Sequence, residues 1–265
     1  MKKVIFGLVL GVSSLGITSC ELNSPKYEEP PQEVVYYSAN RYSHAMFFDV
    51  VKQAMEITKL QVDNPTGNKF PAGVTVTPVL EEGKLVSLTV EYSEINGRVG
   101  KLEISYSGIP FAEGSSMLIK PMDLTYHPGI KVEGPIKLDF KAKGDAKNKF
   151  MIFIEKGILT DKVGAMINYG SNLSCEQKEG KVAETSDDTF TFTGSEYGVF
   201  VNKVSYNLTI ANPIVYTYTS PYASEGKVTM TPSGYTDSFS IEFGKGNALN
   251  HVYLTYKDKS GLYYI

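Results

Sequence analysis

The stretch Leu88-Thr89-Val90-Glu91-Tyr92 shows the pattern that decides the fold. Its apolar residues alternate with polar ones at a period of two, which is typical of a strand with one packed face and one wet face. The same alternation returns in residues 102–106, 136–140, 239–243 and 252–256. The sequence therefore predicts a mainly β fold with about a dozen short strands, either an antiparallel β-sandwich or an elongated open sheet.

Turn signals separate these runs. Pairs in which a polar residue precedes glycine favour tight turns, because glycine adopts the left-handed backbone that such turns need. The sequence predicts turns at Glu82-Gly83, Asn96-Gly97, Ser107-Gly108, Glu133-Gly134, Glu225-Gly226 and Ser260-Gly261.

Upstream of the strands, residues 40–61 follow a helical period instead. At about 100° per residue, six apolar side chains share one stripe, while charged residues such as Asp49 and Glu56 lie on the other side. The stripe contains Tyr42, Met46, Phe47, Val50, Ala54 and Ile57. We expect one N-terminal amphipathic helix that packs across a face or end of the sheet, capped at its start by Ser38 or Ser43.

The first 20 residues have the layout of a secretory signal peptide. Lys2 and Lys3 precede a short apolar run, and Ile17-Thr18-Ser19 leads with small residues into Cys20. These last four residues resemble the lipobox of bacterial lipoproteins, in which the cysteine is acylated and becomes the first residue after cleavage. The resemblance implies that residues 1–19 are a signal peptide and that Cys20 carries palmitate or a similar fatty acid.

The rest of the chain divides into two parts. Residues 20–37 are rich in proline and acids and have no periodicity, so we expect a lipid-anchored tether that does not order itself. Residues 38–265 form the β-rich body with its N-terminal helix. A polar stretch near residues 178–190 indicates either a long loop or a seam between two β lobes, and we favour one continuous body.

Three turn-rich segments carry a family resemblance. In residues 96–108 a Gly-Arg turn leads through Gly-Lys into an alternating strand, and Lys131-Val132-Glu133-Gly134 follows as a hairpin. The turn Phe243-Gly244-Lys245-Gly246 is the third segment. Together they resemble uncharacterised β-rich lipoproteins of the Bacteroidota, many of which carry a cysteine where Asn247 and Ala248 stand here. The resemblance implies a β-sheet lipoprotein and brings no known activity with it.

Charge and hydropathy limit the partners. The 265-residue chain has a formal net charge of −3, and its basic residues form no stripe, which argues against nucleic acid and against charge-driven binding to anionic lipid. No apolar run reaches the ~18–20 residues that a membrane-spanning helix needs. We therefore expect attachment to the outer membrane by N-terminal acyl chains alone, on the periplasmic side or at the cell surface.

The histidines and cysteines indicate no reactive site. The three histidines lack the spacing of a metal pair, and we expect each at the surface or half-buried. They are His44, His127 and His251. If Cys20 carries lipid, Cys175 has no partner in the chain, and we expect it to be buried as a small hydrophobic residue. We therefore predict no catalytic residue, no metal and no cofactor.

Tyrosine is abundant, with 18 Tyr and 13 Phe but no Trp. Such residues pack between strands, and they also form surfaces that face a ligand, since one end of tyrosine is apolar and the other polar. Four tyrosines in the C-terminal half are the candidates for a ligand-facing cluster: Tyr216, Tyr218, Tyr222 and Tyr235.

Three functions fit these observations. The first is a non-catalytic binding or assembly module that works through protein or glycan contacts. The second is an envelope or glycan hydrolase, which would need two carboxyl groups ~5–9 Å apart. The adjacent Asp187-Asp188 does not supply them, because neighbouring strand residues point to opposite faces. The third is a lipid carrier, which would need an apolar trough in the open sheet.

Overall fold

A computed structural model describes the chain from residue 31 onward, with five short gaps. The described residues are 31–65, 70–94, 97–180, 187–220, 222–244 and 250–265. Four predictions lie outside them, wholly or in part: the signal peptide, the lipidated Cys20, the turn at Asn96-Gly97, and the late turn from Lys245 onward. Most of the predicted tether lies outside them too.

The described residues contain one α-helix and 14 strands. The helix is α1 (Gln32–Asp63). The strands are β1 (Val74–Glu81), β2 (Lys84–Tyr92), β3 (Arg98–Ser107), β4 (Ser116–Tyr126), β5 (Ile130–Glu133), β6 (Ile136–Phe140), β7 (Asn148–Thr160), β8 (Met166–Lys178), β9 (Thr189–Val199), β10 (Ser205–Thr217), β11 (Ala223–Pro232), β12 (Phe239–Phe243), β13 (His251–Tyr256) and β14 (Lys259–Tyr264).

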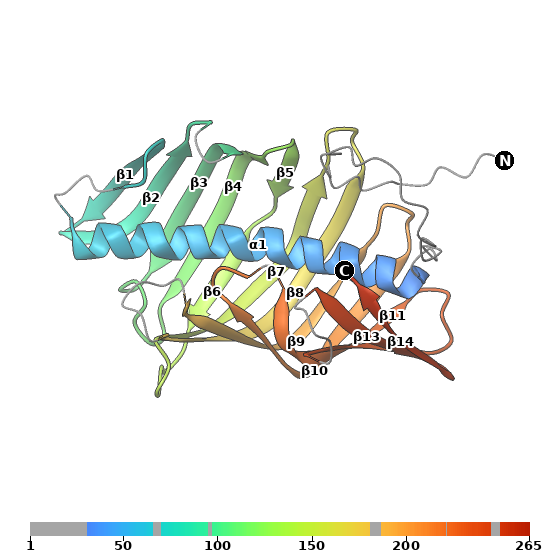
Figure 1. The fold of residues 1–265 in the computed structure, drawn as a ribbon. Coiled ribbons are helices and arrows are strands. Elements are labelled where there is room, and N and C mark those ends of the chain that lie inside the picture. Colours follow the sequence, from blue (N-terminus) through green and yellow to red (C-terminus); the bar gives the residue numbers. More distant parts are fainter. Residues whose placement is uncertain (1–30, 66–69, 95–96, 181–186, 221, 245–249) are drawn as a thin grey trace, which may run out of the picture. The chain divides into compact units, whose positions relative to one another are not determined.

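All strands belong to a single antiparallel sheet, in which neighbours in space are almost everywhere neighbours in sequence (Figure 1). The exception is the pair β5 and β6, which share one position between β4 and β7. Between them Gly134 has a φ of +106°, and a Cβ there would lie 2.2 Å from the carbonyl oxygen of Lys156. The mainly β prediction is confirmed, and of its two alternatives the open sheet is the one observed.

The predicted seam near residues 178–190 is the connection between two paired strands. The strands β8 and β9 pair from Asn168 opposite Val199 to Lys178 opposite Thr189. The sheet therefore continues across this region, and Pro31–Ile265 forms one compact unit.

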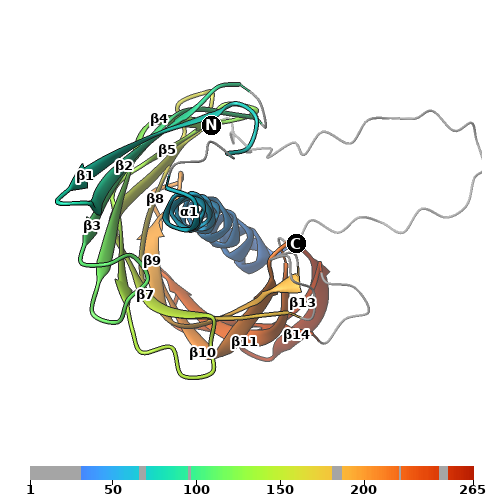
Figure 2. The same ribbon diagram turned by 90° about the vertical axis from the view of Figure 1, so that its left-hand side faces the viewer.

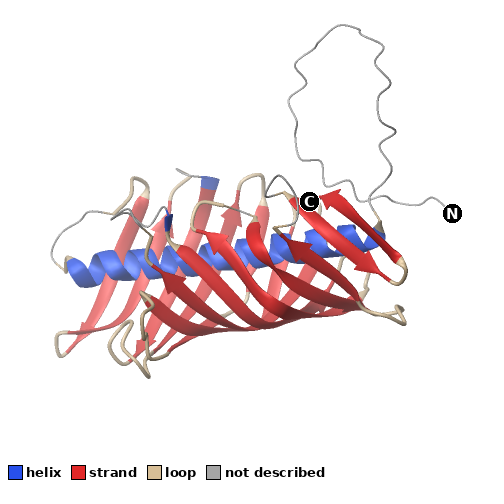
Figure 3. Cartoon of the chain, turned by 60° about the horizontal axis from the view of Figure 1, so that its bottom comes forward, coloured by secondary structure: helices blue, strands red, loops and turns tan. Residues whose placement is uncertain are grey.

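The sheet curls around α1, which lies along its concave face (Figures 2 and 3). Four residues of the predicted apolar stripe are buried there: Phe47, Val50, Ala54 and Ile57. The other two, Tyr42 and Met46, are partly buried against the same core. From the sheet, every second residue points inward to meet them. These side chains include Leu88, Val90, Leu102, Ile104, Ile136, Leu138, Phe239, Ile241, Val252 and Leu254. The period of two therefore identified the packed face correctly.

Two of the predicted turns were wrong. Glu225-Gly226 lies inside β11, where the pairing with β10 shifts register and Gly226 has a φ of +119°. Ser260-Gly261 lies inside β14, because the chain reverses just before it, at Lys257 and Asp258. Glycine in these strands marks an irregularity of the sheet rather than a loop.

The helix begins earlier than predicted. It starts at Gln32, so residues 32–37 belong to α1 and not to the tether. Val34 and Tyr37 already pack into the core, but the next buried positions, Asn40, Ser43 and His44, are polar. These polar residues interrupt the apolar stripe, so the sequence pattern does not indicate the first two turns of the helix. Pro31 occupies the N-cap without a side-chain hydrogen bond, and the hydroxyl of Ser43 donates to Ala39 within the helix, so neither predicted cap is present.

A buried polar cluster explains why Asn40 and His44 are polar although they face the core. Glu196 of β9 is only 4% exposed, and its Oε1 lies 2.6 Å from Nδ1 of His44. Asn40 donates to the other carboxylate oxygen at 2.8 Å, and the hydroxyl of Tyr169 donates to Oε1 at 2.9 Å. The prediction of a surface or half-buried His44 was therefore wrong, because the buried carboxylate provides the ring with a partner inside the core.

Replacing Glu196 by alanine should lower the free energy of unfolding by about 3–5 kcal/mol, since it leaves the buried partners of this carboxylate unpaired. Urea denaturation measures the change. Glu91→Ala is the matched control, because Glu91 pairs with Lys101 at the exposed surface and should matter little. Equal effects of the two substitutions would contradict a role for the cluster in holding α1 on the sheet.

The tyrosines generate a second prediction. Burial is the main cause of a raised pKa in nine of them: Tyr37, Tyr42, Tyr92, Tyr106, Tyr126, Tyr169, Tyr206, Tyr216 and Tyr235. An unfolded chain ionises tyrosine near pH 10, at a lower pH than the folded chain does. The neutral buried tyrosines therefore contribute their full stability below about pH 10 and lose it progressively as the pH rises above that value.

We expect tyrosinate absorbance to rise in two steps during an alkaline titration. The exposed tyrosines should ionise first. The buried tyrosines should ionise only when the protein unfolds, which is seen as loss of the β signal in circular dichroism. A single step near pH 10 with an unchanged β signal would show that these hydroxyls are accessible in the folded protein.

Candidate functional site

A cavity of about 240 Å³ lies between the C-terminal half of α1 and one rim of the sheet. The helix supplies Phe48, Lys52, Met55, Glu56, Lys59, Val62 and Asp63. The rim supplies Phe111, Lys143, Lys147, Asn148, Gln177, Phe190 and Tyr218. Segments that are far apart in sequence therefore meet here, because the ends of β8, β9 and β10 and the loops before β4 and β7 reach the same side of α1.

The apolar part of the lining is a group of aromatic rings held by one another. Phe48 of α1 packs edge-on against Phe190 of β9, with 5.0 Å between ring centroids. The ring of Tyr218, which follows β10, lies 6.1 Å from Phe190 in a tilted arrangement. Phe190 itself is buried. Contacts of this kind fix the rings in place and give the cavity a preformed apolar surface.

Lys52 lies over this aromatic surface. Its Nζ is 4.9 Å from the ring centroid of Tyr218 and 5.7 Å from that of Phe48. It also donates a hydrogen bond of 3.3 Å to the main-chain oxygen of Tyr218. The pKa of Lys52 is lowered, mainly because burial disfavours the charged ammonium group. Asp49 and Glu56 act against this shift, but Asp49 forms its ion pair with Arg98, and no carboxylate of a described residue lies within ion-pair distance of Lys52.

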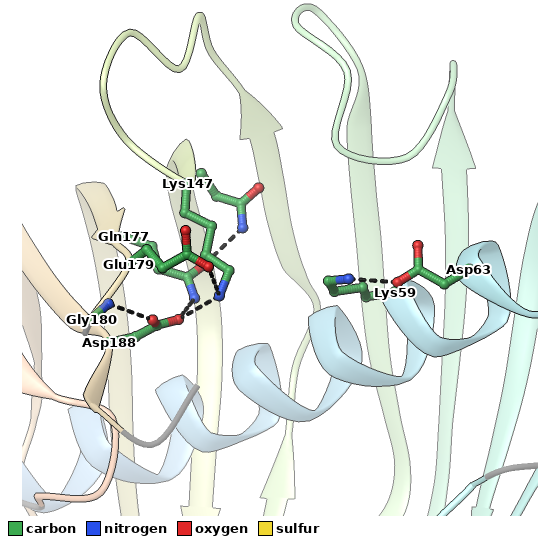
Figure 4. A network of polar contacts seen from close by, with 8 residues as sticks. Lys59, Asp63, Lys147, Gln177, Glu179, Gly180 and Asp188 are labelled. Carbon is green, nitrogen blue, oxygen red and sulfur yellow. Dashed lines mark hydrogen bonds and ion pairs between the residues drawn. The ribbon is translucent and has the colours of Figure 1, made fainter. Parts of the chain in front are cut away.

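Lys147, which lines the cavity from the rim, is held by a polar network (Figure 4). Its Nζ lies 3.0 Å from Oδ2 of Asp188, whose side chain is fully buried, and 3.8 Å from Glu179. Asp188 also accepts hydrogen bonds from the Gln177 side chain at 2.7 Å and from the main-chain N–H of Gly180 at 3.1 Å. Asp188 thus positions Lys147 beside the cavity.

The remaining charges of the lining are exposed. Lys59 pairs with Asp63 one turn along α1, as Figure 4 also shows. Glu56 accepts a hydrogen bond of 3.2 Å from the hydroxyl of Tyr218. Lys143 has no carboxylate of a described residue within ion-pair distance. Four lysines and two carboxylates therefore line the cavity, and Asp188 and Glu179 beside it balance the charge of Lys147.

The four predicted tyrosines do not form one cluster. Tyr218 lines the cavity, whereas Tyr216 is buried and stacks on His44 with 5.5 Å between the ring centroids. Tyr222 lies under the guanidinium of Arg41, and Tyr235 packs beside Tyr36 near the start of the helix. A ligand-facing role stays a prediction for these residues, with Tyr218 the one that the structure places at a cavity.

The other predicted residues lie away from the cavity lining. Cys175 is fully buried as predicted, and burial raises the pKa of its thiol. His127 is exposed and His251 is half-buried, which confirms the expectation for these two. Among the described residues no group of three His, Cys, Asp or Glu side chains could hold a metal ion. No helix within the described ranges is long and apolar enough to span a membrane.

Sequence reasoning missed the lysines of the cavity. A signal was present on α1, where Lys52 and Lys59 are seven residues apart and so share a face with Phe48 and Met55. The rim gave a weaker signal, a lysine-rich stretch over residues 141–149. Neither pattern shows that the two segments meet, because that depends on how the sheet curls.

Comparison with known proteins found no matching family, no matching curated protein and no matching solved structure. The residues that line the cavity therefore indicate what kind of ligand it can bind. A preformed aromatic surface favours the apolar part of a ligand, and a few polar groups at its edge orient the rest. The arrangement can hold a small ligand that has both an apolar and a polar part.

Proposed function

We propose that this protein is a lipid-anchored lipoprotein of the bacterial cell envelope whose folded part is a non-catalytic binding module. The cavity between α1 and the rim of the sheet is the observation that carries the binding role. Its rings are fixed by mutual contacts, and Lys147 is fixed by buried Asp188, so the site is organised before a ligand arrives. Such preorganisation reduces the entropy lost on binding.

The course of α1 favours a binding module over a carrier with an open trough. Apolar residues on the concave face of the sheet are covered by the helix, and they include Leu88, Ile104 and Phe192. The cavity at the rim, in contrast, leaves part of its apolar lining within reach of a ligand. A small molecule fits this site, and so does a projecting group of a larger protein or glycan partner.

The anchor part of the proposal depends on the sequence. The basic start, the apolar run and Ile17-Thr18-Ser19-Cys20 support a signal peptide over residues 1–19 and palmitate or a related acyl chain on Cys20. This places the body at the outer membrane, with the remaining tether as its connection. The resemblance to β-rich lipoproteins of the Bacteroidota agrees with this proposal.

Cys20→Ala should abolish incorporation of a clickable palmitate analogue in bacterial cells that process lipoproteins, because the acyl chain has lost its attachment site. Gel fluorescence of the full chain measures the label. Cys175→Ala is the matched control: this thiol is buried, so its loss should leave the label unchanged. Label that persists in Cys20→Ala, or a wild-type chain without label, would refute the anchor.

A thermal-shift screen tests the binding role. Compounds that bind the folded full chain should raise its melting temperature, and a ligand at 100 times its Kd adds about 2.7 kcal/mol of stability. We expect the hits to lose their effect in Tyr218→Ala, which removes a ring of the cavity, and to keep it in Tyr264→Ala, which removes an exposed ring elsewhere. A broad screen without hits, or hits insensitive to Tyr218→Ala, would argue against this site.

A further inference from the structure

The cations of the cavity point to one class of ligand. We propose that the site selects a small organic anion with an apolar body, whose head is a carboxylate or a phosphate monoester. This inference rests on the proposed binding function and specifies its ligand. It is carried by Lys52, which lies over two aromatic rings, and by Lys143, an exposed residue of the same lining; neither has an ion-pair partner among the described residues.

The lysines of the lining differ in how their charge is balanced. Lys59 has Asp63, and Lys147 has Asp188 with Glu179 nearby. Lys52 and Lys143 have no carboxylate of a described residue within ion-pair distance, and Asp49 and Glu56 attract Lys52 only from further away. An anion can therefore reach both ammonium groups without breaking an ion pair. A Lys ammonium group acts as a point charge that binds carboxylate and phosphate alike, whereas arginine would distinguish them by bidentate geometry.

The setting of Lys52 strengthens this attraction. Its ammonium group is half-buried over two aromatic rings, and its one hydrogen-bond acceptor among the described residues is the main-chain oxygen of Tyr218. Charges attract more strongly where water is partly excluded. An anion seated beside Lys52 would compensate the desolvation of its ammonium group. The carboxylate of Glu56, which already accepts from Tyr218, limits the head to one anionic group on this side.

The aromatic surface and the volume set the size of the body. Phe48, Phe111 and Phe190 offer ring surface, and Met55 adds a flexible apolar side chain. The volume of about 240 Å³ corresponds to roughly eight water molecules at about 30 Å³ each. A methylene group takes up about as much space as a water molecule, so an eight-carbon chain is a probe of matching size, while a bare inorganic anion would leave the rings uncovered.

Titration calorimetry of the full chain at constant ionic strength tests the inference with matched probes. Octanoate and octyl phosphate have both the anionic head and the apolar chain. Octanol and octylamine keep the chain but have a neutral or a cationic head, and acetate and inorganic phosphate have the anionic head without the chain. We expect both octyl anions to bind at least about tenfold more tightly than the other four probes. Octanol and octylamine lose a charged hydrogen bond, which has about this effect, and acetate and inorganic phosphate lose the burial of the apolar chain.

Lysine variants locate the effect. Lys52→Met and Lys143→Met keep the apolar stem and remove the charge, and together they should lower the affinity for octanoate about tenfold or more. Lys162→Met, on the exposed loop after β7, is the control and should change nothing. Circular dichroism confirms that each variant is folded, and the comparison of probes on the wild-type chain does not depend on the variants.

The outcomes separate this inference from the proposed function. If octanol binds as tightly as octanoate, the selection of anions is overturned, but the binding role is not. In that case the lysine side chains only cover apolar surface with their stems and give no preference for an anion. Inorganic phosphate that binds as tightly as octyl phosphate would overturn the apolar body. No binding by any octyl probe would overturn the inference, and the binding role itself would fall only if the thermal-shift screen were also blank.

Discussion

The packing of α1 against the concave face of the sheet is the interaction on which the rest of the structure depends. An antiparallel sheet with one apolar face must bury that face against another layer. Here the second layer is a single helix, so the sheet curls until successive strands contact it (Figure 2). Gly157 in β7 shows how close the approach is, since a Cβ there would lie 2.6 Å from the ring of Phe47.

The candidate site follows from the same packing. Towards its C-terminal end α1 still buries Ala54 and Ile57 against the sheet, while Lys52 and Lys59 turn towards the rim. The strand ends and loops of the rim complete the lining. The cavity thus forms where the helix meets the edge of the sheet. Its geometry therefore depends on how stably α1 is packed against the sheet.

Much of the fold could be predicted because strand alternation is a local property. Leu88, Val90 and the inward residues of later strands follow from the period of two alone. The start of α1 could not be predicted, because Asn40 and His44 stand where apolar residues would be expected. Their partner, Glu196, lies more than 150 positions away in the sequence. The cavity was missed for the same reason: Lys52 and Lys147 come together only through the curvature of the sheet, which no short window of sequence contains.

The order of the elements has a consequence for how the chain acquires its structure. Strand pairing is almost entirely between sequence neighbours, so the sheet can grow hairpin by hairpin with small losses of loop entropy. The helix is made first, yet its partners on β9 and β10 are made near the end, and contacts of such long sequence separation slow folding. During synthesis α1 can meet its partners on β3, β4 and β8 early, whereas Asn40 and His44, at its start, gain Glu196 only when β9 has been made.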